Sequence, residues 1–237
     1  MINLNYKNNK EIIAIDGPSW VGKSTIAYAL SKLIKYDYVN TGCIYRSISK
    51  KIFDNNIEPG NVKEIIKVIE NSKIKFETGR IFMDNKDITN YISTPEINIF
   101  TTKIAAIPEV RALLLESIRE MGKKGRMIFE GRDIGTNIFP ESDWKFFIHA
   151  SMDIRVERFK KLQPLEKKEK YSIDEIKTII TKIDKTDRER KVSPLKIAKD
   201  AILYDNTDSP NAEQDAIILK HYITNWEEIK NNSNLKK

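Results

Sequence analysis

The chain has 237 residues, 40% of them hydrophobic, so it can bury a full core as one domain with insertions or as two small domains. It carries 41 Lys and Arg against 34 Asp and Glu, and the resulting formal charge of +7 suits anionic ligands. Because no basic module interleaved with aromatic residues accompanies this charge, we expect no nucleic-acid partner. The single cysteine, Cys43, excludes an intrachain disulfide and fits a reducing interior.

The N-terminal segment, residues 1–10, is polar and rich in asparagine. It does not resemble a signal peptide, and no later apolar run approaches the length that spans a membrane. The two histidines do not pair with cysteine or acidic residues at the spacing of metal ligands. We therefore expect a cytoplasmic protein without a membrane partner, with flexible tails at residues 1–10 and 229–237.

An apolar run at 12–15 leads into a loop framed by glycines, and residues with helical spacing follow the loop. This order of strand, loop and helix is the context that a phosphate-binding loop requires. Backbone N–H groups in such a loop surround phosphate oxygens, helped by the positive end of the helix. Lys23 would reach the β- and γ-phosphates, and the Ser24 hydroxyl would ligate Mg²⁺. The predicted nucleoside-triphosphate site comprises Gly17, Pro18, Ser19, Trp20, Val21, Gly22, Lys23, Ser24 and Thr25.

Trp20 stands at a loop position that is often occupied by a small residue, frequently glycine. If the backbone there has a positive φ, a residue other than glycine costs about 1–2 kcal/mol. Two interpretations remain open. The indole packs on the surface beside the nucleotide, or it weakens nucleotide binding.

Hydrophobic spacing and turn signals predict the remaining elements. Residues 36–39 predict a strand and residues 44–53 a helix. Between residues 54 and 91 the pattern changes to that of a small α+β insert, with a helix at 62–71 and a hairpin with strands at 74–77 and 81–84. The later elements are helices at 95–104 and 110–121, strands at 127–129 and 144–149, a helix at 153–161, a lysine-rich loop at 163–172, a helix at 173–190, a strand at 201–204 and a helix at 211–226.

Strands that alternate with helices predict an α/β fold with a parallel sheet and right-handed crossovers. Ligands of such folds bind at the carboxyl ends of the strands. Arginine binds phosphate bidentately, so Arg46 and Arg132 are candidate clamps for a second, acceptor phosphate, although each could instead form a surface ion pair. The polar strand ends are Asp16, Asn40-Thr41, Glu130-Gly131-Arg132-Asp133 and Asp205-Asn206-Thr207.

The segment Asp187-Arg188-Glu189-Arg190 lies on the predicted helix that follows the lysine-rich loop. These charges could be no more than i,i+3 pairs on a helix surface. Their position is also that of a mobile lid, and one inserted arginine can accelerate phosphoryl transfer by about 10³–10⁵. A lid that brings Arg188 or Arg190 over the phosphates would supply that charge and exclude water.

From residue 12 to about residue 207 the chain resembles the bacterial cytidylate kinase family of nucleoside-monophosphate kinases. The motif Gly131-Arg132-Asp133-Ile134-Gly135-Thr136, followed by Phe139-Pro140, is highly specific. The resemblance implies a three-layer α/β/α P-loop fold with a parallel sheet, an α+β monophosphate-binding insert and a helical lid. The other matching motifs are Ile15-Asp16-Gly17-Pro18-Ser19, Thr41-Gly42-x-x-Tyr45-Arg46, Asp187-x-x-Arg190-x-x-x-Pro194-Leu195 and Asp200-Ala201.

The same resemblance implies a Mg²⁺-dependent, in-line transfer of phosphate from ATP to CMP or dCMP by a monomeric enzyme. Lys23, Arg132, Arg188 and Arg190 would act on the transferred phosphate. The implied nucleotide contacts are Thr102, Arg111 and Asp133 on the cytosine ring, Arg46, Arg132 and Arg190 on the acceptor phosphate, Asp187 on the sugar, Thr41 in the same acceptor site, and Arg155 and Arg158 beside the adenine of ATP.

The implied parts divide the chain into a P-loop core, an insert and a lid. The core comprises 11–53, 104–160 and 195–228, the insert 54–103 and the lid 161–194. The sequence departs from the family pattern at several positions. The lid has Ile183 where the family usually has arginine, and Glu130, Asn40 and Ser93 replace the usual Asp, Asp and Arg.

These departures keep two alternatives open. The chain could be a nucleotide-binding protein with weakened catalysis, or a P-loop phosphotransferase for another anionic acceptor. Losing the lid arginine should reduce transition-state stabilisation unless Arg188 or Lys182 replaces it.

Overall fold

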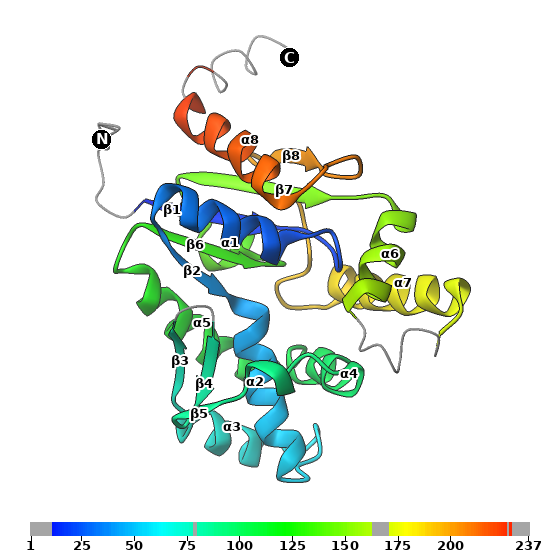
Figure 1. Ribbon diagram of the computed structural model, residues 1–237. Coiled ribbons are helices and arrows are strands. Elements are labelled where there is room, and N and C mark those ends of the chain that lie inside the picture. The colour runs from blue at the N-terminus through cyan, green and yellow to red at the C-terminus, as the bar shows by residue number, and fades with distance from the viewer. Residues whose placement is uncertain (1–10, 78–79, 163–170, 227, 229–237) are drawn as a thin grey trace.

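The computed structural model describes residues 11–77, 80–162, 171–226 and 228 (Figure 1). The two predicted tails and most of the lysine-rich loop fall outside these residues. Five parallel strands form the main sheet, which confirms the predicted α/β class. In spatial order they are β2 (Asp37–Asn40), β6 (Met127–Gly131), β1 (Ile12–Asp16), β7 (Trp144–His149) and β8 (Ile202–Asp205).

Helices cover both faces of this sheet, because alternate residues of its central strands enter different cores. Ile12 and Ala14 of β1 pack in the core that contains residues of α2 (Thr41–Asp54) and α5 (Pro108–Gly122). Ile13 and Ile15 pack in the core with α1 (Lys23–Ile34) and α8 (Ala212–Thr224). The result is the expected three-layer arrangement.

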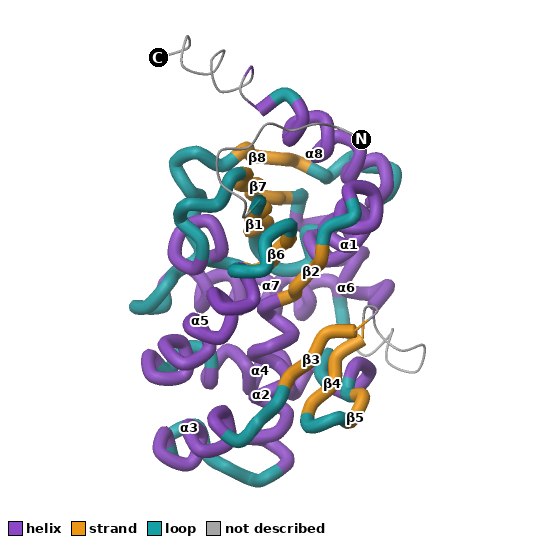
Figure 2. The backbone as a smooth tube through the Cα atoms, turned by 90° about the vertical axis from the view of Figure 1, so that its left-hand side faces the viewer, coloured by secondary structure: helices purple, strands orange, loops and turns teal. Residues whose placement is uncertain are grey.

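The segment between α2 and α5 contains a second sheet, as the hairpin signal predicted (Figure 2). Strands β3 (Ile74–Glu77) and β4 (Arg80–Met83) pair antiparallel, and a two-residue strand that the sequence did not indicate, β5 (Lys86–Asp87), adds to β4. The other elements of the segment are α3 (Val62–Glu70), the short 3₁₀ helix η1 (Thr89–Tyr91) and α4 (Pro95–Ile104).

Two further helices lie side by side next to the turn that follows β1 (Figure 1). They are α6 (Met152–Leu162) and α7 (Ile173–Glu189), and they share a small apolar core. A capping box at Ser172 and Glu175 fixes the start of α7. In the part of the chain that the structure describes, no helix is long and apolar enough to cross a membrane.

Two further local features differ from the sequence-based expectations. Helix α2 begins at Thr41, three residues before the predicted start at 44, because the Asn40 side chain accepts a hydrogen bond from the Cys43 N–H and caps the helix there. A π-helical turn, η2 (Ile134–Ile138), follows β6, and hydrophobic spacing gave no sign of it.

Candidate active site

The loop between β1 and α1 has the backbone of a phosphate-binding loop. Gly17 has a φ of 150°, and a Cβ added there would lie 2.1 Å from the carbonyl oxygen of Ile148 on β7. Gly22, with a φ of 94°, forms the left-handed N-cap of α1. Both positions therefore need glycine, which explains the two glycines that frame the loop.

Trp20 has a φ of 57°, so the positive φ considered from the sequence is present. Its ring lies 5.1 Å, between centroids, from that of Phe159 on α6. The indole belongs to the small apolar core of α6 and α7. Of the two open interpretations, the structure supports packing of the indole, against those helices.

Lys23 is the first residue of α1 and is buried. Its Nζ donates to the carbonyl oxygen of Pro18 over 2.6 Å. Burial, and then the charge of Arg132, lower the pKa of Lys23 to about 7. Burial also raises the pKa of Asp16 to about 6, although the Ile134 and Gly135 N–H groups donate to its carboxylate at 2.9 and 2.8 Å.

The lowered pKa of Lys23 predicts a pH dependence of ATP affinity. Phosphate binds the protonated ammonium, whereas free Lys23 loses its proton as the pH rises through about 7. We expect the affinity for ATP to fall by up to about tenfold per pH unit between about pH 7 and pH 9. Calorimetry in buffers of different ionisation enthalpy should detect proton uptake on binding in this range. A flat affinity without proton uptake would contradict the assignment.

Ser24 lies between two polar side chains from neighbouring strands. Its hydroxyl donates to Oε1 of Glu130 over 2.7 Å, and the Asn40 amide donates to the same hydroxyl over 3.3 Å. The second oxygen of Glu130, Oε2, is buried and has no hydrogen-bond partner among the described residues. A hydroxyl beside a carboxylate oxygen that needs a partner fits Mg²⁺, which prefers oxygen ligands.

Ser24 and Glu130 offer fewer ligands than a dedicated protein metal site. Within the described ranges, no group of three or more His, Cys, Asp or Glu side chains could hold a metal ion. A Mg²⁺ ion that takes most of its ligands from water and substrate phosphates needs only one or two protein oxygens. Glu130 was noted in the sequence as a strand-end acid, and the structure places it on the hydroxyl of Ser24.

Two arginines join the strand end of β6 to helix α7 and its C-terminal end. Nε of Arg132 pairs with Asp187 over 2.8 Å, and its Nη2 donates to the Ser19 hydroxyl over 3.0 Å. Nη2 of Arg190 pairs with Asp133 over 3.2 Å, and its Nη1 lies 3.5 Å from Asp187. The structure therefore brings four of the predicted acceptor-site residues into one network beside the phosphate loop.

Arg111 extends this network into α5. Its Nη2 pairs with the other oxygen of Asp133 over 2.5 Å, and both side chains are buried. Its guanidinium also stacks over Tyr45 of α2, with 5.4 Å between the guanidinium carbon and the ring centroid. Asp133 thus holds two arginines at once, one on each carboxylate oxygen.

Three predicted acceptor residues lie on α2 and α4. The Nη2 of Arg46 contacts the Cys43 sulfur at 2.8 Å, and its Nε is buried without a partner among the described residues. Thr41 donates its hydroxyl to the Glu130 carbonyl oxygen over 2.7 Å. The Thr102 hydroxyl donates to the carbonyl oxygen of Ile99, one turn earlier on α4, over 2.8 Å.

Arg155 and Arg158 both contact the phosphate loop from α6. Arg158 donates to the carbonyl oxygen of Val21 over 2.9 Å and to Oδ1 of Asn206 over 3.0 Å, which places it between the loop and the end of β8. Arg155 is buried, donates to the carbonyl oxygen of Ser19 over 2.8 Å and forms an ion pair with Asp184. Arg155 therefore joins the phosphate loop to α7.

Asp184 also accepts a hydrogen bond from the backbone N–H of Ser19 over 3.1 Å. From the sequence, the neighbouring Ile183 was singled out and Asp184 was given no role. A signal was available, because Asp184 lies one helical turn before Asp187 and so shares its face of α7. Arg188, the other lid arginine predicted to be catalytic, is exposed, and no hydrogen bond or ion pair connects it to the loop among the described residues.

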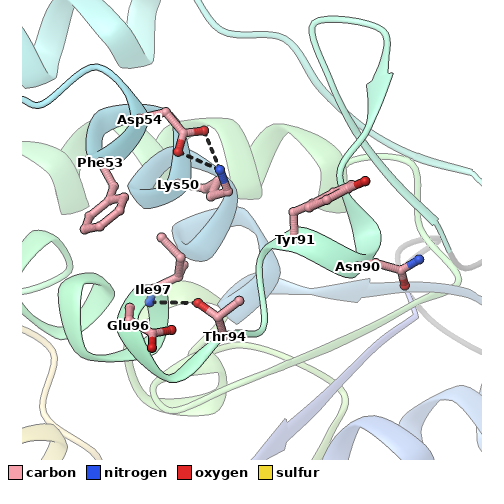
Figure 3. A pocket seen from close by; sticks show the side chains of 8 residues that line it. All are labelled: Lys50, Phe53, Asp54, Asn90, Tyr91, Thr94, Glu96 and Ile97. Carbon is pink, nitrogen blue, oxygen red and sulfur yellow. Dashed lines mark hydrogen bonds and ion pairs between the residues drawn. The ribbon is translucent and has the colours of Figure 1, made fainter. Parts of the chain in front are cut away.

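Two hollows lie outside this network. A groove of about 980 Å³ reaches Ser24 and Asn40 from the open edge of β2. A cavity of about 240 Å³ lies between α2, η1 and α4, and Lys50 and Asp54 form an ion pair beside it (Figure 3). The residues that line the smaller cavity include no predicted site residue.

A family model and curated proteins match most of this chain. The family model described as "Cytidylate kinase" matches residues 13–223. The chain is 38% identical over 214 residues to a cytidylate kinase of Caldanaerobacter subterraneus, covering 90% of this chain and 92% of that protein. It is 39% identical over 197 residues to a cytidylate kinase of Clostridium botulinum, covering 83% of this chain and 90% of that protein.

Among solved structures, a gluconokinase from Sinorhizobium meliloti aligns with this chain with a TM-score of 0.47 at 12% identity. The alignment covers 94% of this chain and 99% of that chain. The family model spans nearly all of the described residues, including the phosphate loop and the arginines at positions 188 and 190. The chain belongs to the cytidylate kinase family.

Proposed function

We propose that this protein is a nucleoside-monophosphate kinase that transfers the γ-phosphoryl group of ATP to CMP, dCMP or both. The observation that carries the proposal is the network of Asp133, Arg111, Arg190 and Arg132 beside a phosphate loop in a chain of this family, with Asp133 and Arg111 buried. It combines a carboxylate that can recognise a base with guanidinium groups that can bind a phosphate.

The ATP end of the site consists of the loop amides and Lys23. Phosphoryl transfer depends mainly on positioning and charge neutralisation. The loop amides and the start of α1 would bind the phosphates, and Lys23 would exchange its bond to the Pro18 carbonyl for phosphate oxygens. Ser24 and Glu130 would hold Mg²⁺, and the ion would supply positive charge against the charge that develops on the phosphates.

The acceptor end would use the arginines that are now paired with carboxylates. Arg132 and Arg190 would exchange bonds to Asp187 for bonds to the acceptor phosphate, and Arg46 has a buried Nε available. A carboxylate such as Asp133 accepts a hydrogen bond from the cytosine amino group, which uracil lacks. The site thereby favours cytosine nucleotides.

The division into core, insert and lid remains part of this proposal, as does a monomeric state. The core would be 11–53, 104–160 and 195–228, the insert 54–103 and the lid 161–194. In the lid, Arg190 already faces the network, whereas Arg188 would have to approach from the exposed side of α7.

An assay of ADP release with MgATP tests the function against CMP, dCMP, UMP, AMP and dTMP. A strong preference for CMP and dCMP would support both the acceptor site and a working lid. Higher turnover on another acceptor would replace the proposed substrate. Binding of ATP and CMP without ADP release would indicate a protein that has lost catalysis.

Glu130→Gln should weaken the use of Mg²⁺ specifically. The amide keeps the shape of the side chain but removes the negative charge next to Ser24. We expect the Mg²⁺ concentration for half-maximal activity to rise by at least about tenfold, with the CMP KM nearly unchanged. Titration of Mg²⁺ at fixed ATP measures this. If the Mg²⁺ dependence of the variant equalled that of the parent, Glu130 would have no part in metal binding.

A further inference from the structure

Helices α6 and α7 have an apolar core of their own, separate from the two that cover the sheet. Its buried members are Val156 and Phe159 from α6 and Ile176 and Ile180 from α7. The phosphate loop contributes Trp20, which packs against this core from outside both helices. A residue of the phosphate loop is therefore also part of the packing of α7, the helix of the proposed lid.

Three aromatic rings extend from the loop to the start of α7. The centroids of Trp20 and Phe159 are 5.1 Å apart with the rings tilted by 54°. Those of Phe159 and Tyr171 are 6.3 Å apart at 81°, close to edge-to-face. Tyr171 directly precedes Ser172, the N-cap of α7. Such spacings are those of favourable aromatic pairs, so the rings form a continuous contact from the loop to the lid helix.

Trp20 occupies a backbone conformation that is disfavoured for a residue with a side chain. A φ of 57° is left-handed, which a tryptophan adopts only when the surrounding structure imposes it. Glycine would adopt this φ without strain but would contribute no ring. The ring therefore has a role that the loop backbone does not require, which is its packing against α6 and α7.

Polar contacts also join the loop to α7, but they differ from the indole in one respect. Ser19 bonds to Asp184, and Arg132 joins the Ser19 hydroxyl to Asp187. Anionic phosphates entering the loop compete for the same donors. The Trp20 contact is apolar, so the negative charge of a nucleotide leaves it in place while the polar contacts exchange.

We propose that Trp20 is a positioning residue that couples the phosphate loop to the lid, holding α6 and α7 on the loop while the ionic contacts exchange for substrate. Nucleotide binding in the loop then sets the position of α7 and of the arginine at its end, Arg190. The kinetic part of this inference rests on the proposed kinase function, whereas the structural coupling does not.

Three variants separate the possible roles of Trp20. Trp20→Phe keeps an aromatic ring, Trp20→Ala removes the ring but keeps the strained backbone, and Trp20→Gly removes both. Tyr28→Ala is the matched control, because Tyr28 is a partly exposed aromatic residue on α1 that is not part of the α6–α7 core. Hydrogen exchange of the amides of α7 with and without MgATP reports the coupling independently of turnover.

We expect Trp20→Gly and Trp20→Ala to raise the exchange rate of α7 amides by about tenfold and to reduce the protection that MgATP adds. In both, kcat/KM for CMP should fall by about tenfold while the Kd of ATP changes by less than about threefold. Trp20→Phe should restore the values to within about threefold of the parent. Tyr28→Ala should leave the exchange of α7 unchanged.

Other results would overturn the inference. Unchanged exchange of α7 in both small variants would show that the ring does not hold the lid. A loss of ATP affinity that parallels the loss of kcat/KM would assign Trp20 to the loop alone. Impairment in Trp20→Ala but not in Trp20→Gly would show that only backbone strain matters.

If a small variant fails to fold, Phe159→Leu tests the same contact from the other side and should also raise α7 exchange. If the parent protein phosphorylates no nucleoside monophosphate yet the exchange results are as expected, the proposed function fails and the coupling stands.

Discussion

Lys23→Ala is expected to lower the rate of phosphoryl transfer by about 10³-fold. The side chain supplies a buried positive charge at the phosphate loop. Phosphoryl transfer depends mainly on positioning the phosphates and neutralising their charge, so removing this charge should slow the transfer strongly. The Nζ now donates to the Pro18 carbonyl oxygen inside the loop, so it is already within reach of the space that the loop surrounds. Steady-state assays with saturating MgATP and CMP measure the effect on kcat.

Stability measurements keep this result from being mistaken for unfolding. Burial lowers the pKa of Lys23 to about 7 in the folded protein. At pH values below the pKa of the unfolded chain, the buried charge of Lys23 therefore lowers the free energy of unfolding. At pH 7 the unfolded state binds more protons at this group, and stability should rise with pH between about 7 and 10. Lys23→Met removes that cost, so we expect inactive protein that is at least as heat-stable as the parent.

Lys32→Ala provides the matched comparison, because Lys32 lies on the same helix and its ammonium lies over the Tyr28 ring. That variant should retain the parent kcat. A near-normal kcat in Lys23→Ala would remove Lys23 from the mechanism.

The phosphate loop and the parallel sheet were predictable because they depend on local signals. The apolar strand, the loop framed by Gly17 and Gly22, and the helical spacing after Lys23 are contiguous in the chain. The hairpin in the insert was predictable for the same reason, since alternation around residues 78–79 marks two strands. The start of α2 was not, because the capping bond of Asn40 shortens the preceding loop.

The partners of the site residues depend on contacts that are distant in the chain. The pairing of Arg155 with Asp184 and the Ser19 carbonyl joins three elements, and no spacing rule connects them. The direction of the Trp20 indole was undetermined for the same reason, since its partner Phe159 lies in another helix. The family motif indicated which arginines gather, but not that they pair with Asp133 and Asp187.

Replacing Asp133 should have the largest effect on acceptor recognition. Asp133→Ala is a poor test, because it leaves Arg111 and Arg190 buried without their carboxylate, and breaking a buried pair destabilises a protein by about 3–5 kcal/mol. Asp133→Asn keeps the shape and one acceptor oxygen. We expect it to raise the KM for CMP by about 100-fold while the KM for ATP changes by less than about threefold.

The amide also changes which base the site can accept. A carboxylate only accepts hydrogen bonds and so suits the cytosine amino group, whereas an asparagine amide can donate to the O4 of uracil. In Asp133→Asn, kcat/KM for CMP should therefore fall while kcat/KM for UMP rises. The ratio of the two should fall by more than kcat/KM for CMP does. Asp200→Asn, which alters the half-exposed partner of Lys145, should leave both the KM for CMP and this ratio unchanged.

Parallel losses on CMP and ATP in Asp133→Asn would assign Asp133 to holding Arg111 and Arg190 in place rather than to the base. The two roles differ in their effect on the ratio. If the carboxylate only positions the two arginines, then weakening its ion pairs leaves the preference between cytosine and uracil unaltered, because both acceptors carry the same phosphate. A changed ratio therefore requires that the side chain at position 133 itself contacts the base.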